Sequence, residues 1–135
     1  MNVNPSRIKS NIDLKKHGYQ VGELMIPWSD NTIPLGYHPI PFINIRSGKG
    51  KSLLIIGGNH GDEFEGPAAI MRISQQIISN EVTGHILLIP SLSFHALKNS
   101  SRTNPLDDRN MNRTFPGNPN GLPSEMLAHL SLIHI

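Results

Sequence analysis

The chain has 135 residues, of which 37% are hydrophobic and 5% aromatic, and this length fits one domain of ordinary size or part of a larger one. Its formal net charge at pH 7 is +2, and its basic residues are scattered rather than gathered in a stripe, which argues against a nucleic-acid partner. Because there is no cysteine, disulfides and thiolate metal sites are excluded, and any bound metal would need histidine and carboxylate ligands.

The N-terminal third of the chain predicts an irregular segment followed by two strands. Residues 1–19 are polar and show no apolar periodicity, so we expect them to be irregular. Val21–Ile26 is predicted to be a short strand that Pro27 ends, and residues 28–34 have the composition of a loop. Ile40–Ile45 alternates as a strand does, and two nearby prolines place its start at an edge or a bulge.

A strand, a helix and a second strand follow at the spacing of a βαβ unit. Ser52–Ile56 is predicted to be a fully buried strand, because it is short, aliphatic and bounded by glycine-rich turns. A helix is expected to start at Gly66–Pro67 and to end within residues 80–84, and Ile86–Ile89 is predicted to be the second buried strand. The two strands should therefore be parallel neighbours in one sheet. One face of the helix should carry the apolar residues Ile70, Ile73, Ile77 and Ile78.

A glycine pair, a histidine and a carboxylate directly after the first strand of this unit suit a metal site. His60 and Glu63 follow the turn Gly57–Gly58, and at this spacing both side chains can reach a common point. Zinc is commonly bound by histidine nitrogen and carboxylate oxygen, and binding sites in such sheets lie beyond the carboxyl ends of the strands. The same spacing also fits a helix-start carboxylate beside a surface histidine. Asp62 and Glu65 are expected to be helix N-terminal charges or supporting groups rather than ligands.

A long loop at residues 102–120 carries the cationic and amide groups that such a site would need. Arg102, Asn112 and Arg113 are able to clamp a carboxylate, because arginine presents a planar fork of donors that matches one. One of the arginines would otherwise polarise a scissile carbonyl. The alternative is a solvated basic loop whose charges pair with the aspartates at 107–108.

The remaining features are interpreted more simply. Ser124 is predicted to cap a last helix, and the apolar end at 131–135 is interpreted as truncated or non-native. With neither a signal peptide nor an apolar run of about 20 residues, the chain is expected to be cytoplasmic and to have no membrane partner. Six histidines lack a partner at ligand spacing and are expected to be structural or exposed: His17, His38, His85, His95, His129 and His134.

The two loops together resemble the succinylglutamate desuccinylase/aspartoacylase family, the acylase branch of the zinc-carboxypeptidase-like hydrolases. The resemblance rests on Gly57–Glu63, on Arg102 and on Asn110–Gly117, and it runs from about Val21 to about Leu130. Within the family, these motifs look most like N-acetyl-2,4-diaminobutyrate deacetylases of ectoine degradation. The implied fold is α/β: a partial three-layer α/β/α sandwich with a mixed sheet, truncated at the C-terminus. Residues 20–130 would be the N-terminal part of a catalytic domain.

The resemblance implies a role for each site residue. His60 and Glu63 would be ligands of one Zn²⁺ per full-length subunit, Arg102 would polarise the amide carbonyl, and Asn112 and Arg113 would hold the substrate carboxylate. The implied reaction is attack of zinc-activated water on the amide of a small N-acyl amino acid.

The family's third zinc ligand, a histidine, and its general-base glutamate have no counterpart in this sequence. The chain alone is therefore expected to be inactive and, with an incomplete sheet, prone to aggregate. Succinylglutamate desuccinylase or aspartoacylase-like activity, and a non-catalytic carboxylate-binding module, are the alternatives. The sequence does not predict the oligomeric state.

Overall fold

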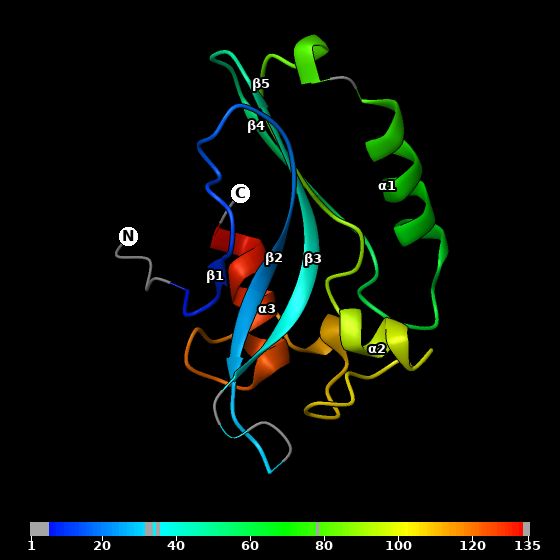
Figure 1. Ribbon diagram of the computed structural model, residues 1–135. Helices are drawn as coiled ribbons and strands as arrows, with labels where there is room; N and C mark the ends of the chain where they lie inside the picture. Colours follow the sequence, from blue (N-terminus) through cyan, green and yellow to red (C-terminus); the bar gives the residue numbers. More distant parts are fainter. Residues whose placement is uncertain (1–5, 32–33, 35, 78, 134–135) are drawn as a thin grey trace.

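The computed structural model describes residues 6–31, 34, 36–77 and 79–133, and its centre is one mixed five-stranded sheet (Figure 1). The strands lie in the order β1-β2-β3-β5-β4. Among the described strands β4 and β5 run parallel, and the other neighbours are antiparallel. The parallel pair predicted from the strand–helix–strand spacing is confirmed. The bounds are β1 Lys9–Ser10, β2 Gly18–Trp28, β3 Gly36–Ser47, β4 Ser52–Ile56 and β5 Gly84–Ile89.

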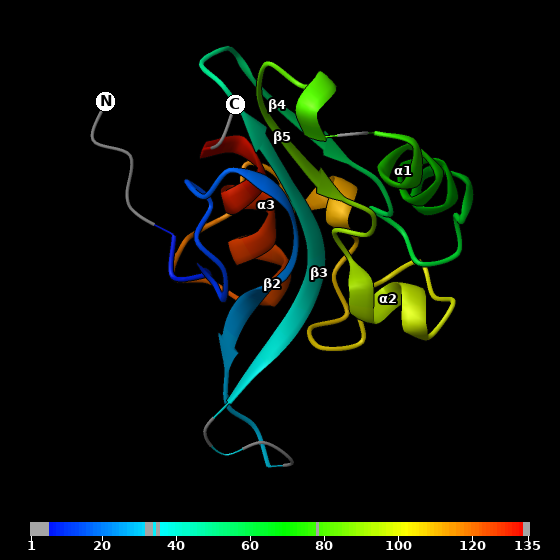
Figure 2. The ribbon, with the colours of Figure 1, turned by 45° about the horizontal axis from the view of Figure 1, so that its top comes forward.

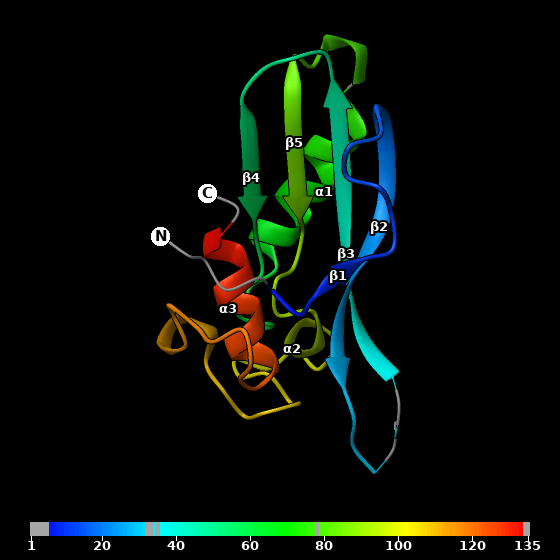
Figure 3. The same cartoon turned by 90° about the vertical axis from the view of Figure 1, so that its left-hand side faces the viewer.

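Helices cover both faces of this sheet. The bounds are α1 Glu65–Gln76, α2 Phe94–Lys98 and α3 Pro123–Ile133, with 3-10 turns η1 Ser79–Glu81 and η2 Met111–Arg113. Figure 2 shows α3 and α1 on opposite sides of the sheet, and Figure 3 shows α3 and α1 separated by the strands. Within the part that the structure describes, no helix is both long enough and apolar enough to cross a membrane.

Two apolar clusters fill the spaces between the layers. Because strand side chains alternate between faces, Ile40 and Phe42 of β3 join the cluster under α3, whereas Ile43 and Ile45 join the one under α1. All four side chains are at most 4% exposed. The three-layer α/β/α arrangement expected from the family resemblance is therefore confirmed.

The N-terminal strands extend beyond their predicted bounds. Residues 1–19 are not wholly irregular, because β1 pairs Lys9 with Met25 across a separation that no local pattern reveals. The prediction that Pro27 ends its strand is also wrong, since Pro27 lies opposite Tyr37 and the pairing continues to Trp28. Proline is tolerated there because, among the described residues, β1 pairs only with Leu24 and Met25, so Pro27 has a strand neighbour on one side alone.

The prediction that Ser52–Ile56 is fully buried is wrong. This segment is β4, the last strand in the sheet order, and Leu53 is 53% exposed. An edge strand among the described residues leaves part of its side-chain surface uncovered, whatever its composition.

The helix α1 is shorter than its apolar pattern predicts. It begins at Glu65 and ends at Gln76, and the backbone at Ile77 is already extended. Ile70 is 4% exposed as expected, but Ile73 is 38% exposed, so the predicted apolar face is only partly covered. Ile78 lies outside the described residues.

Ser124 does not cap the last helix, which begins one residue earlier at Pro123. Asp107 performs that task from the preceding loop, since its carboxylate accepts from the Ser124 backbone N–H at 2.7 Å and from its hydroxyl at 2.9 Å. The helix α3 continues through residues 131–133, and the final two residues lie outside the description.

Candidate metal centre

The loop after β4 is shaped by its glycines. Beyond the strands, the Gly57 N–H donates to the Ile89 carbonyl, and the Leu92 N–H donates to the Gly57 carbonyl, each at 2.9 Å. Gly58 then turns the chain with a positive φ of 59°, where a side chain would also press on Ser91. The turn positions His60 at the carboxyl end of the parallel strands β4 and β5, as predicted from the sequence.

The same loop is seated on α2. The Gly61 N–H donates to the Ser101 carbonyl at 2.9 Å, and a Cβ at Gly61 would overlap the carbonyl of Ala96. Glycine at this position therefore lets the loop approach the helix backbone directly. No sequence pattern predicts α2, because its five residues are too few to show a helical period.

His60 and two carboxylates form a compact cluster of possible metal ligands. His60 is 2% exposed, and its Nδ1 lies 3.1 Å from Oε1 of Glu63. The potential ligand atoms of His60, Asp62 and Glu63 all lie within 4.8 Å of one another. The structure therefore brings together His60 and Glu63, the two ligands predicted from the sequence, and adds Asp62, which was predicted to be a helix N-terminal charge or a supporting group.

Arg102 approaches the cluster from the second loop. Its Nη1 lies 3.0 Å from Oε1 of Glu63 and 3.6 Å from Oδ1 of Asp62. The hydrogen bond with His60, followed by the one from Arg102, lowers the pKa of the Glu63 carboxyl below its ordinary value. Glu63 in turn raises the pKa of Arg102. Glu63 is thus held as a carboxylate, the form that binds a metal.

The turn η2 brings further polar groups to the first loop. Asn112 accepts at Oδ1 from Nδ2 of Asn59 at 3.2 Å, whereas Arg113 follows on the same turn with an exposed side chain. Oδ1 of Asn110 lies 2.9 Å from Nε2 of His60. Asn59 and Asn110 were missed in the sequence, since asparagine is common in loops and their partners lie 53 and 50 residues away.

The alternative of a basic loop paired with its own aspartates does not describe Arg102 or Asp107. Arg102 pairs with Glu63 instead, and Asp107 accepts from Ser124. Asn112 and Arg102 therefore lie beside the first loop rather than in a separate solvated segment.

Two histidines outside the cluster also meet. His38, 8% exposed, contacts His95 edge to face with ring centroids 4.8 Å apart. Their separation of 57 positions explains why sequence spacing gave no sign of the pair.

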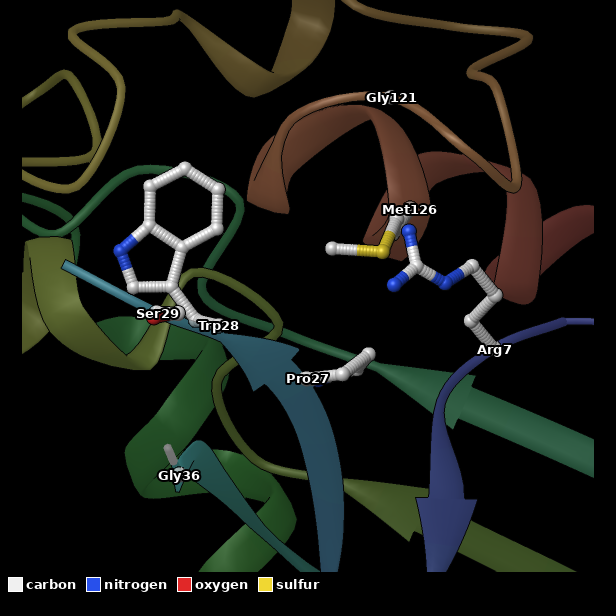
Figure 4. Close-up of a pocket in the computed structure, with 7 residues that line it drawn as sticks. All are labelled: Arg7, Pro27, Trp28, Ser29, Gly36, Gly121 and Met126. Carbon is white, nitrogen blue, oxygen red and sulfur yellow. The ribbon is translucent and has the colours of Figure 1, made fainter. Parts of the chain in front are cut away.

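A pocket of about 380 Å³ lies at the end of β2 that carries Trp28 (Figure 4). His60, Asp62 and Glu63 do not line this pocket. Its lining comes from the ends of the β2–β3 hairpin, the start of α3 and the N-terminal segment: Arg7, Pro27, Trp28, Ser29, Gly36, Gly121 and Met126.

Comparison with known proteins agrees with this geometry. The model of the succinylglutamate desuccinylase/aspartoacylase catalytic domain matches residues 49–133. The chain is 36% identical over 124 residues to the N-alpha-acetyl-L-2,4-diaminobutyric acid deacetylase of Halomonas elongata, a match that covers 92% of this chain and 36% of that protein.

Solved structures show the same fold. The product-bound ectoine utilization protein EutE (DoeB) from Ruegeria pomeroyi has a TM-score of 0.88 at 36% identity, over 93% of this chain and 38% of that one. A succinylglutamate desuccinylase from Silicibacter has a TM-score of 0.87 at 36% identity, with the same coverage. The chain thus has a zinc-carboxypeptidase-like fold and spans little more than a third of the length of these relatives. It belongs to the succinylglutamate desuccinylase/aspartoacylase family.

Proposed function

We propose that the protein is a zinc-dependent amidohydrolase that removes the acyl group from a small N-acyl amino acid such as N-acetyl-2,4-diaminobutyrate. The observation that carries this proposal is the cluster of His60, Asp62 and Glu63 beside Arg102 of the second loop. The 36% identity to a diaminobutyric acid deacetylase supports the choice of substrate. Residues 20–130 would form part of the catalytic domain.

The donor set at the cluster fits zinc. His60 and Glu63 would hold the ion through imidazole nitrogen and carboxylate oxygen, both common zinc ligands, and Asp62 is close enough to adjust the local charge. Bound zinc supplies a water of lowered pKa and polarises a carbonyl. The family resemblance places the third ligand, a histidine, and the general-base glutamate outside this sequence.

The neighbouring residues suit the substrate. Arg102, which is 54% exposed in its side chain, would exchange its contact with Glu63 for the carbonyl oxygen of the scissile amide and stabilise the charge that develops there. Asn112 and Arg113 would hold the carboxylate. Because Asn59 occupies Oδ1 of Asn112, the Nδ2 end of that amide remains as the donor for an anion.

Zinc affinity of this chain is the first test. We expect the wild-type chain to bind Zn²⁺ in a competition assay with a chromophoric chelator. His60→Ala should weaken binding by at least about 100-fold, since losing a group that merely orients a ligand already costs about 10–100-fold. His17→Ala, which changes an exposed histidine, is the matched control. Equal affinity in all three proteins would contradict the proposed site.

Activity is tested on a version extended through the family's third ligand. We expect it to release acetate from N-acetyl-2,4-diaminobutyrate faster than it cleaves N-acetyl-aspartate or N-succinyl-glutamate, and chelation should stop the reaction. Carboxylate binding that ignores the chelator, with no turnover of any substrate, would instead indicate a binding module.

A further inference from the structure

Asn110 has a side-chain orientation that its backbone neighbours determine. Its Oδ1 accepts from the Asn112 backbone N–H at 3.0 Å and thereby caps η2. Its own carbonyl accepts from the Thr114 hydroxyl at 2.8 Å, which holds the backbone. A backbone N–H can only donate, so the atom facing it must be the amide oxygen and not the nitrogen.

This orientation decides which nitrogen of His60 carries a hydrogen. Nε2 of His60 lies 2.9 Å from the same Oδ1 of Asn110. Since that oxygen can only accept, Nε2 must donate to it. A neutral imidazole has one ring N–H, so Nδ1 is left with a lone pair.

The lone pair at Nδ1 faces a second acceptor. Oε1 of Glu63 lies 3.1 Å from Nδ1, so the hydrogen bond between them needs a second ring proton, and without that proton two electron-rich atoms oppose each other in a site where His60 is 2% exposed. Such a pair is stable only when a cation, either a proton or a metal ion, is shared between its members. Because Nε2 donates to Asn110, a cation can bind to His60 only at Nδ1, the nitrogen that faces Glu63.

We propose that Asn110 is a positioning residue that holds His60 as the Nε2–H tautomer and thereby makes Nδ1 the metal-binding atom. The proposal rests on the proposed zinc site and adds the residue that orients its buried ligand. The neutral amide acts on the ring from the side opposite the metal and bears no charge of its own. Metal-bound histidines characteristically donate their second N–H to such an acceptor.

Three variants separate this role from that of a loop cap. Asn110→Ala removes the acceptor and should lower zinc affinity by about 10–100-fold. Asn110→Asp keeps an acceptor oxygen for both donors and should bind zinc at least as tightly as the wild type. Asn118→Ala is the control, because Oδ1 of Asn118 caps the Asn120 N–H at 3.0 Å in the same loop as Asn110, and it should leave the affinity unchanged.

A measurement on the wild-type chain requires no variant. Long-range ¹H–¹⁵N correlation of the zinc-loaded chain, with His60 assigned by comparison with His60→Ala, should show a protonated Nε2 and a metal-bound Nδ1. The reverse assignment, or an Asn110→Ala protein that is folded by circular dichroism and binds zinc normally, would overturn the proposal. If His60→Ala also left the affinity unchanged, the zinc site itself would fail, and the two failures are thereby distinguished.

Discussion

Gly61 links the loop that carries His60 to α2, and the close approach of the two backbones leaves no space for a side chain. Substitution by alanine must push the loop away from Ala96 and disturb the hydrogen bond to Ser101. We expect Gly61→Ala to lower the free energy of unfolding by about 1–3 kcal/mol, the typical cost of forcing extra atoms into closely packed surroundings. Urea denaturation monitored by circular dichroism measures the loss.

Gly66 provides the matched control for this change. A Cβ there would lie 3.5 Å from its nearest neighbours, Gly57 and Gly58, which is an ordinary contact, and the residue lies in the first turn of α1. Gly66→Ala should therefore be neutral or stabilising by about 0.5–1 kcal/mol. Equal stability of the two variants would show that the loop is not seated on α2 as described.

At the scale of single residues, whether a site residue could be predicted depends on how close in the sequence its contacts lie. His60 and Glu63 follow a strand and a glycine turn, so their proximity was predictable from adjacent sequence. The proximity of Arg102 and Asn112 was suggested by the chemistry of their side chains and implied by the family resemblance, because no local pattern determines it. Asn110 escaped notice because its role depends on a contact with His60 that only the folded chain creates.

At the scale of elements, the strands and helices with a pattern longer than one turn were predictable. The existence of very short elements and the exposure of an edge strand were not. The parallel pairing of β4 and β5 followed from composition and spacing. The strand β1 has two residues and α2 five, too few to show a period. The exposed Leu53 of β4 depends on which strands lie beside it, a property of the sheet order rather than of the segment.

The contact between β3 and α2 should be sensitive to acid. His38 of β3 and His95 of α2 meet edge to face, and Nε2 of His38 is buried without a hydrogen-bond partner among the described residues. Burial, then His38 and then Lys98, lowers the pKa of His95 to about 4. Burial also lowers the pKa of His38, against the opposing charge of Asp30.

Stability should therefore fall as the pH drops from about 6.5 to about 4. Above this window His95 is neutral in both states; within it the unfolded chain binds a proton that the folded chain excludes, so acid favours unfolding. His95→Phe keeps an aromatic ring and should reduce the proton uptake on unfolding by about one. Urea titrations at several pH values test this, with His17→Phe as an exposed control; an unchanged slope in His95→Phe would count against the pair.

For the whole molecule, the sheet order determines how copies of the chain should interact. On the described residues β4 pairs with β5 on one side only, which leaves a row of backbone donors and acceptors beside the exposed Leu53. Such an edge is a template for pairing with another strand, and two copies of β4 related by a twofold axis satisfy each other. The relatives are more than twice as long, so their additional chain is a candidate to cover the corresponding edge.

We accordingly expect the purified chain to self-associate with increasing concentration in sedimentation velocity. Leu53→Lys places like charges opposite each other across the paired strands and removes apolar contact, so it should weaken the association roughly tenfold, or about 1.4 kcal/mol. Met71→Lys introduces the same charge at a side chain of α1 that is 45% exposed and belongs to a helix rather than to a strand, and it should leave the association unaltered. Equal weakening by both variants would mean that net charge, rather than the β4 edge, governs assembly, because a charge effect has no preference for the strand over the helix.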